Sequence, residues 1–549
     1  MPRSFPYSWA ALLVVLVVVP LLACLCLHPA GAAADNVNMY ELSTRPWLYS
    51  LSLKARTTHA RTTAPPRRLL VSAADRWLTY GRNISRLVDV PMEEFAAIKQ
   101  KGMDIVWLMG VWHLGSYGLN YDRTDPGTLS SYDSILPGWT LPDVIGSPYA
   151  VTQYTANPQL GSDADIAGLR ARLNSMGLKL MLDFVPNHSA VDAVQMSTNP
   201  DYYIRAPKGT QPPYDSNVYM PSGIAYGSDG YGPWKDTAQY NYWNPDTRAA
   251  RIKELFYVAS LADAIRCDMA YLAINNLFGQ TWGSQLASWG FSRPATEFWA
   301  DAISAVKSVY PNVVFLAEVY SPWQGDLQAQ GFDYTYDKAL YDLITSDDLD
   351  NVRGHISGSS VSYLTHSAHF VANHDEERAA AHFGGWTQAN AAALIMYTIP
   401  GMRFYWMGDF EGYKAKLAVQ LRRESWEPVH NATEQFYATL LPIVTADVFN
   451  KYVHVHVHVG HVDVPGGERV EQRLAADGVA LGRLCVINYS DTAGSGSVIV
   501  SNAQAPPGTD NLTITELLSG QSYVRSASQM RNSGLFVIVP PWYAQIFSY

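Results

Sequence analysis

The stretch Ala264-Ile265-Arg266-Cys267-Asp268 decides how this chain is interpreted. It predicts a short buried strand that ends in a carboxylate, with an arginine two residues earlier. Strand side chains alternate between faces, so Arg266 and Asp268 point one way while Ile265 and Cys267 point the other. A guanidinium beside a carboxylate lowers the carboxylate's pKa and keeps it ionised. The pattern suits a covalent nucleophile and also a structural ion pair, and the rest of the chain separates these interpretations.

Further strand patterns surround this one, and helical patterns separate them. Residues 163–176, for example, carry apolar side chains at helical spacing, and Gly177 ends the pattern. Strands alternating with helices over residues 35–440 predict an α/β fold, a closed (β/α)8 TIM barrel rather than an open sheet. The eight predicted strands are led by Tyr40, Ile105, Lys179, Ala264, Val314, Phe332, Phe370 and Arg403.

The composition changes in three other regions of the chain. Residues 189–242 follow the third predicted strand, are rich in Tyr, Pro and Gly, and predict a long functional loop. Residues 441–549 contain short apolar runs separated by Gly, Pro and Asn, which predict a C-terminal antiparallel β-sandwich domain. An Arg-, Thr- and Pro-rich stretch at about 54–68 predicts a surface insertion into the barrel.

Residues 1–34 predict a targeting segment. Their apolar run, 10–27, is interrupted by Pro20 and followed by the small residues Ala30-Gly31-Ala32. Because the run is shorter than the roughly 20 residues of a spanning helix, we favour a cleaved signal peptide and a secreted protein. An uncleaved signal anchor that holds the protein at a membrane is the alternative.

The glycosylation sequons agree with a secretory route, and the cysteines bear on disulfide bonds. Removal of residues 1–34 would leave only Cys267 and Cys485, so no disulfide framework is expected. Four sequons would make the protein a glycoprotein; they begin at Asn83, Asn431, Asn488 and Asn511.

Charge and composition limit the classes of ligand that the protein is expected to bind. The formal net charge is −10 without basic blocks, which argues against nucleic acid. The 16 Trp and 34 Tyr suit a carbohydrate binder and equally a large core. His454, His456 and His458 alternate with valines, so they could bind a divalent metal or simply face solvent on an exposed strand.

Four predicted strands end in acidic residues: Asp183, Asp268, Glu318 and Asp375. In a parallel barrel the carboxyl ends of the strands meet at one mouth. Neighbouring carboxyls shift one another's pKa, so that one can stay protonated while another stays ionised.

These motifs, in this order, resemble glycoside hydrolase family 13, the α-amylase family. The matching segments are Asp183-x-x-x-Asn187-His188, Arg266-x-Asp268, Glu318 and Asn373-His374-Asp375, and the resemblance extends from about Tyr40 to the C-terminus. It implies a retaining glycosidase that acts on α-glucosidic bonds of oligo- or polysaccharides, and it implies that residues 189–242 are a small inserted domain, called domain B in the family.

The resemblance also implies roles for individual residues. Asp268 would form a covalent glycosyl-enzyme, Glu318 would be the acid and base, and Asp375 would grip the distorted sugar. The carboxyls of Asp268 and Glu318 would lie roughly 5–5.5 Å apart. The substrate-binding residues that it implies are Tyr149, His188, Arg266, His374 and Asp183, the last as a partner of Arg266.

The chain also departs from the family. Tyr271-Leu272 stand where many α-amylases carry Lys-His after the nucleophile, which puts the leaving-group contacts and the calcium site in doubt. Asn187 matches a calcium-ligand position, so calcium is an expectation of the resemblance, while the mechanism requires no cofactor.

Two other functions stay open. A transglycosylase or isomerase of the same family shares the covalent intermediate. Heavy chains of amino-acid transporters resemble the family as well, and they suggest a non-enzymatic membrane partner. The complete carboxylate set favours an enzyme.

Overall fold

The computed structural model describes residues 36–54, 84–346, 348–446 and 482–549. The targeting segment 1–34, residues 55–68 of the predicted insertion and the histidines at 454–458 lie outside the described residues. Within the described part of the chain, no helix is both long and apolar enough to cross a membrane.

Eight parallel strands pair in chain order and close into a barrel, which confirms the predicted TIM barrel. The ring closes where Asn38 pairs with Arg403. Nearly all strand residues are buried, because the outer helices cover one face and the barrel core fills the other. The strands are β1 (Asn38–Ser43), β2 (Ile105–Met109), β5 (Lys179–Phe184), β9 (Ala264–Cys267), β10 (Val314–Ala317), β11 (Tyr334–Tyr336), β12 (Ser367–His369) and β13 (Met402–Trp406).

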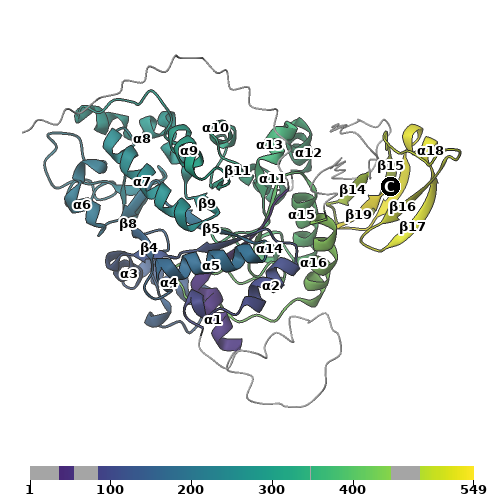
Figure 1. Ribbon diagram of the computed structural model, residues 1–549, viewed down its shortest axis with the longest axis horizontal. Coiled ribbons are helices and arrows are strands. Elements are labelled where there is room, and N and C mark those ends of the chain that lie inside the picture. The colour runs from purple at the N-terminus through teal and green to yellow at the C-terminus, as the bar shows by residue number, and fades with distance from the viewer. Residues whose placement is uncertain (1–35, 55–83, 347, 447–481) are drawn as a thin grey trace, which may run out of the picture. The chain divides into compact units, whose positions relative to one another are not determined.

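Helices surround these strands (Figure 1). Ser162 and Asp165 form a capping box that starts α5, and the Asn244 side chain caps α7, which has Pro245 in its first turn. The helices are α1 (Thr44–Lys54), α2 (Met92–Gln100), α5 (Asp163–Ser175), α7 (Pro245–Leu261), α8 (Asn275–Ser288), α9 (Phe298–Val309), α10 (Gln324–Ala329), α11 (Lys338–Thr345), α12 (Leu349–Gly358), α13 (Val361–Thr365), α14 (Ala379–His382), α15 (Trp386–Thr398) and α16 (Asn431–Val444).

The sixth and seventh strands differ from the predicted ones, which were 331–334 and 369–373. β11 begins at Tyr334, because Gly331 turns at a φ of +107° before it. β12 ends at His369, and the buried apolar run after it leaves the sheet as a loop. Asn373 stabilises that loop, since its Oδ1 accepts the backbone N–H groups of Asp375 and Glu376.

Two small sheets follow barrel strands. β3 (Trp112–Leu114) and β4 (Val151–Ala156) form an antiparallel pair, with α3 (Ser116–Asp122) and α4 (Pro126–Ile135) between them. The segment 189–242 has its own three-stranded sheet and a short helix. These elements are β6 (His188–Ala190), α6 (Val194–Thr198), β7 (Tyr226–Ser228) and β8 (Pro233–Gln239).

The described C-terminal residues form antiparallel sheets with their own apolar cluster, as predicted. One sheet has the order β14-β19-β16-β17 and the other pairs β15 with β18. The predicted boundary at residue 440 falls inside α16, whose Leu440 and Leu441 belong to the barrel core. The elements are β14 (Arg483–Asn488), β15 (Gly494–Val498), β16 (Asn511–Glu516), β17 (Gln521–Ser526), α18 (Ala527–Asn532), β18 (Leu535–Val539) and β19 (Tyr543–Ser548).

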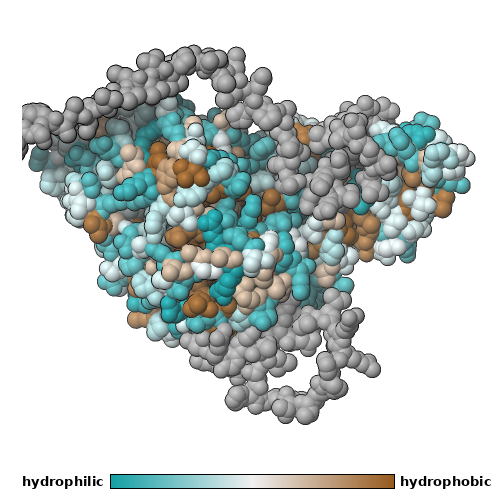
Figure 2. All heavy atoms as spheres, in the orientation of Figure 1, coloured by the Kyte–Doolittle hydropathy of each residue, from teal (hydrophilic) through white to brown (hydrophobic). Residues whose placement is uncertain are grey.

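The sequon at Asn488 does not fit the glycoprotein expectation. Asn488 is buried, and its Nδ2 donates to the carbonyl oxygens of Thr492, Val539 and Pro540. This amide is therefore not available to carry a glycan. On the face shown in Figure 2, hydrophilic residues predominate and hydrophobic residues form small separate groups.

Candidate active site

One guanidinium joins two carboxylates at the mouth of the barrel. Arg266 is fully buried, with Nη1 2.6 Å from Oδ1 of Asp268 and Nη2 2.6 Å from Oε2 of Glu318. Oδ1 of Asp183 lies 3.5 Å from the same Nη1. β9 lies between β5 and β10 in the barrel, so three neighbouring strands deliver these acids. The structure thus brings together four of the residues that the sequence singled out.

Burial has the largest effect on the pKa values of Asp268 and Glu318. It raises the pKa of Glu318 to about 7, against the opposing charge of Arg266 and with a further rise from Asp268. Burial also raises the pKa of Asp268 despite Arg266, and the charges of Asp375 and Asp183 add to this rise. The sequence-based expectation of a lowered pKa for Asp268 was wrong in direction, because strand alternation alone did not include the cost of burial.

Two further donors fix the Glu318 carboxyl. The Met269 backbone N–H donates to Oε2 at 2.7 Å, and the Tyr320 hydroxyl donates to Oε1 at 3.0 Å. Met269 has the left-handed backbone conformation, with a φ of 43°, which is rare for a residue that is not glycine. Because Oε2 already accepts from Arg266 and Met269, Oε1 is the oxygen that can carry the acidic proton.

A second cluster surrounds His374. Its Nδ1 lies 2.6 Å from Oε1 of Glu41, and its Nε2 lies 3.1 Å from Oδ2 of Asp375. Burial lowers the pKa of His374, but Asp375 and Glu41 outweigh burial and raise it well above its usual value. Partial burial raises the pKa of Asp375, whereas His374 holds it down, at about 2. The Asp375 side chain is 44% exposed, so it is the carboxylate that faces the opening.

Tyr149 connects the two clusters. Its hydroxyl lies 2.7 Å from Nε2 of His374, and its ring stacks on the His374 ring at 5.4 Å between centroids. The Arg266 guanidinium lies 5.2 Å from the centre of the same ring. The structure therefore places an aromatic ring beside the carboxylates, while its role in stacking on a sugar stays a prediction.

Aromatic side chains pack beneath these polar groups inside the barrel. Trp107 makes an edge contact with His374, and Arg266 lies over both Trp107 and Tyr336. This layer excludes water from one side of the site and strengthens its electrostatic interactions. Its contacting rings are Trp107, Tyr336, Phe370 and Phe404.

His188 reaches the site indirectly. Its ring hydrogen-bonds the Tyr149 backbone and makes an edge contact with Trp234 at 5.1 Å. Burial lowers its pKa to about 3, so the ring is neutral. His188 therefore supports Tyr149, while the predicted contact with a sugar stays a prediction.

The surroundings of Asn187 do not fit a calcium ion. Oδ1 of Asn187 accepts from Nε2 of Gln239 at 2.9 Å, and Nδ2 of Asn187 donates to Oε1 of Gln239 at 3.2 Å. Calcium requires six to eight oxygen ligands, but here the amide oxygen is turned toward an N–H donor. Among the described residues, no group of three or more His, Cys, Asp or Glu could hold a metal.

Sequence reasoning missed Glu41 and Tyr320. Glu41 comes from the first strand, 333 residues before its partner His374, and only the topology brings them together. Tyr320 could have been found, because it lies two residues after Glu318 and so on the same face if the extended chain continues. Tyr271 packs against Tyr320 by an edge contact at 5.6 Å, which makes the position of the absent Lys-His pair aromatic.

Comparison with known proteins settles the family. The model of the α-amylase catalytic domain matches residues 98–439, more than half of the chain. This chain belongs to the α-amylase family. The matched range contains Asp183, Arg266, Asp268, Glu318 and Asp375, whereas Glu41 precedes it.

This α-amylase-family chain has distant curated relatives. The α-amylase MalA of Haloarcula japonica is 25% identical over 378 residues, which span 66% of this chain and 49% of that protein. The α-1,4-glucan:maltose-1-phosphate maltosyltransferase of Rhodospirillum rubrum is 26% identical over 276 residues, 48% of this chain and 32% of that protein. The chain spans about half or less of the length of these two relatives.

Solved structures agree on the fold of this family member. The maltogenic α-amylase AmyB of Thermotoga neapolitana superimposes with a TM-score of 0.57 at 17% identity. The match covers 94% of this chain and 98% of that protein. At this identity the likeness shows the fold alone.

Proposed function

We propose that this α-amylase-family member is a retaining glycosidase that cleaves α-glucosidic bonds of α-glucans. The observation that carries the proposal is the Arg266 bridge, which holds Asp268 and Glu318 side by side with different hydrogen-bond environments. Of these two carboxyls, Glu318 has a pKa raised to about 7, and its Oε1 accepts from the Tyr320 hydroxyl rather than from an N–H group. These properties suit one nucleophile and one acid.

The first step uses both carboxyls. An Asp268 oxygen attacks the anomeric carbon, and the bond from that carbon to the leaving oxygen breaks. Glu318 transfers its proton from Oε1 to the leaving oxygen, so the departing sugar is neutral. Arg266 stays bound to both carboxylates and balances the negative charge that Glu318 acquires.

The second step reverses these roles. Glu318 removes a proton from an incoming water, whose oxygen attacks the anomeric carbon and displaces Asp268 from its ester. The two inversions leave the anomeric configuration unchanged. Asp375 and His374 would hold sugar hydroxyls, since Asp375 is anionic and exposed toward the opening.

Transfer to a second sugar is the alternative outcome of the same intermediate. The maltosyltransferase among the relatives supports it, as does the aromatic Tyr271 beside Tyr320, which offers a sugar-binding face on the acid side of the site. In that case a sugar hydroxyl replaces water in the second step.

Product analysis tests the proposal. The protein is incubated with maltotriose and maltoheptaose, and proton NMR records the anomer that first appears. We expect α-anomers, and longer oligosaccharides if transfer competes. Asp268→Asn should abolish turnover, whereas Asp263→Asn, just before β9 at the opposite end of that strand, should retain it. Absence of turnover by the folded wild-type protein would instead favour the non-enzymatic partner role.

A further inference from the structure

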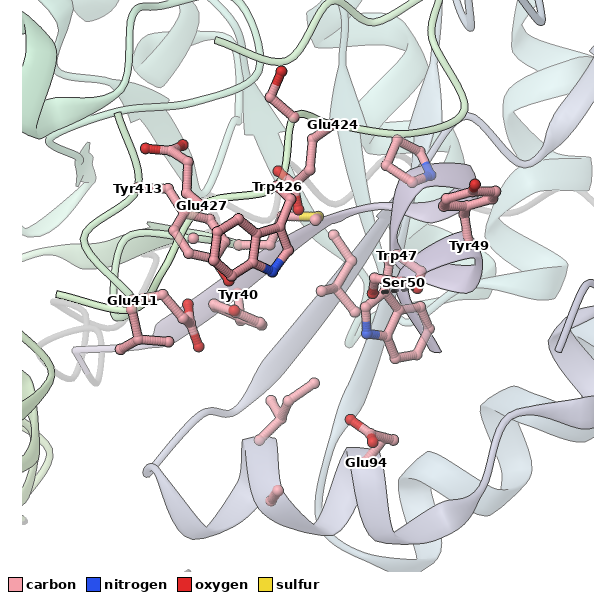
Figure 3. Close-up of a pocket in the computed structure, with 18 of the residues that line it drawn as sticks. Tyr40, Trp47, Tyr49, Ser50, Glu94, Glu411, Tyr413, Glu424, Trp426 and Glu427 are labelled. Atoms are coloured by element: carbon pink, nitrogen blue, oxygen red, sulfur yellow. Dashed lines mark hydrogen bonds between the residues drawn. The ribbon is translucent and has the colours of Figure 1, made fainter. Parts of the chain in front are cut away.

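A cavity of about 190 Å³ lies on the outer side of β1, apart from the carboxylates (Figure 3). Tyr40 and Leu42 line it, while Glu41 between them holds His374 inside the barrel. Strand alternation explains this division, because neighbouring residues face opposite sides. None of Asp268, Glu318 and Asp375 lines the cavity.

Aromatic side chains from three parts of the chain meet at this cavity. Tyr40 belongs to β1, Trp47 and Tyr49 to α1, and Tyr413 and Trp426 to the segment between β13 and α16 (Figure 3). Trp426 is 75% exposed, so its indole offers an open face at the rim. Large aromatic surfaces of this kind bind ligands that have an apolar face and a polar edge.

At least two of the four glutamates that line the cavity have partners within the protein. Glu424 pairs with Arg378 at 2.9 Å, and Glu427 accepts the backbone N–H groups of Lys414 and Ala415. Glu411 also lines the cavity and contributes to a raised pKa of Glu424. Lys101 also lines the cavity, so the cavity offers hydrogen-bond acceptors beside a cation of its own, which favours a neutral ligand with hydroxyl groups over a cation.

We propose that this cavity is a second carbohydrate-binding site, which takes one glycosyl unit at the end of an α-glucan. Its volume is below the roughly 300–1,000 Å³ of pockets for drug-sized ligands, so it suits one ring. Trp426 would stack on the sugar face, and Glu411 would accept sugar hydroxyls. The choice of an α-glucan rests on the proposed function, whereas the site itself does not.

The wall of the cavity also contacts the loop that carries Asp375. Arg378, three residues after Asp375, binds Glu424, and Nζ of Lys416 donates to the Asp375 backbone oxygen at 2.9 Å. Arg378 therefore connects the cavity to the loop that carries Asp375.

Calorimetric titration with maltotriose tests the proposal on the Asp268→Asn variant, which leaves the sugar intact. We expect two binding sites. Adding Trp426→Ala should weaken one of them at least tenfold, and Tyr149→Ala should weaken the other. Phe536→Ala is the matched control, since Phe536 is a 62% exposed aromatic residue on β18, outside the cavity. It should change neither site.

Other outcomes separate the two proposals. A single site that depends on Tyr149 and ignores Trp426 overturns the second site and leaves the proposed function standing. A single site that depends on Trp426, with no site that depends on Tyr149, contradicts the proposed function.

Glu411→Gln tests the class of ligand without removing an aromatic ring. This substitution should weaken the binding of maltotriose only a few-fold. The assignment to a sugar would be overturned if the cavity bound tetramethylammonium and no maltotriose, and if Glu411→Gln abolished the binding of tetramethylammonium.

Discussion

Glu41 on β1 holds His374 through a contact of 2.6 Å between Oε1 and Nδ1, although the two residues are 333 positions apart in the chain. Both side chains are buried. The opposite nitrogen of the ring faces Asp375. Glu41 thereby keeps His374 charged and oriented, and His374 in turn keeps Asp375 ionised.

Glu41→Gln tests this relationship. Because the pKa of His374 is raised in the folded protein, protonation of His374 stabilises the fold. This stabilisation is complete below the unfolded pKa of about 6.5 and is lost as pH rises through the folded pKa. The amide removes one of the two charges that raise this pKa, so the stability lost above about pH 6.5 should be smaller and the loss should be complete at a lower pH. Urea unfolding across pH 6–10 measures it. An unchanged pH dependence would show that Glu41 does not set the charge of His374.

Glu318→Gln should separate the acid from the nucleophile. We expect kcat on maltotriose to fall by about 10²–10⁴, the contribution of general acid–base catalysis. Hydrolysis of α-glucosyl fluoride should fall much less in its first step, because fluoride leaves without a proton. An equal loss on both substrates would contradict the role of Glu318 as the acid.

The pH dependence of the wild-type enzyme follows from the pKa of about 7 for Glu318. The acid must carry its proton, so kcat/KM should decline as pH rises through about 7. Tyr320→Phe removes the donor to Oε1, which stabilises the charged form, and the pKa should therefore rise by about 1. The decline should shift to higher pH. Tyr271→Phe, which leaves the Tyr320 hydroxyl in place, is the control, and a shift in that variant as well would refute the role of Tyr320.

Met269 carries backbone strain at the site, with a φ of 43°. Glycine adopts this conformation freely, whereas alanine pays the same cost as methionine. We expect Met269→Gly to be about 1 kcal/mol more stable than Met269→Ala in chemical denaturation. If Met269→Ala is the more stable variant, the left-handed conformation is not strained in the protein.

Much of the fold could be predicted from the sequence because its signals are local. The strand at Ala264–Cys267 and the strand at Met402–Trp406 are short, mainly apolar runs, each with one arginine. The sixth and seventh strands were misplaced, since β11 and β12 are short and the buried run after β12 leaves the sheet.

The site residues at the ends of strands could be predicted from the sequence. The contacts that these residues make with partners far away in the chain could not. The pairing of Arg266 with Asp268 follows from alternation, but the pKa of Asp268 depends on burial by other elements. Glu41 gives no local signal that it will contact His374. The reciprocal amide pair of Asn187 with Gln239, which turns the predicted calcium ligand away, joins residues 52 positions apart. The targeting segment 1–34 and its secretory role stay predictions.

Trapping of the covalent intermediate tests the central claim most directly. The protein is treated with 5-fluoro-α-glucosyl fluoride, a slow substrate that accumulates the glycosyl-enzyme, and digested peptides are examined by mass spectrometry. We expect one fluoroglucosyl group, attached to Asp268 and absent from Asp268→Asn. A label on Glu318 or Asp375, or turnover with inversion and no label, would contradict the assignment of Asp268 as the nucleophile.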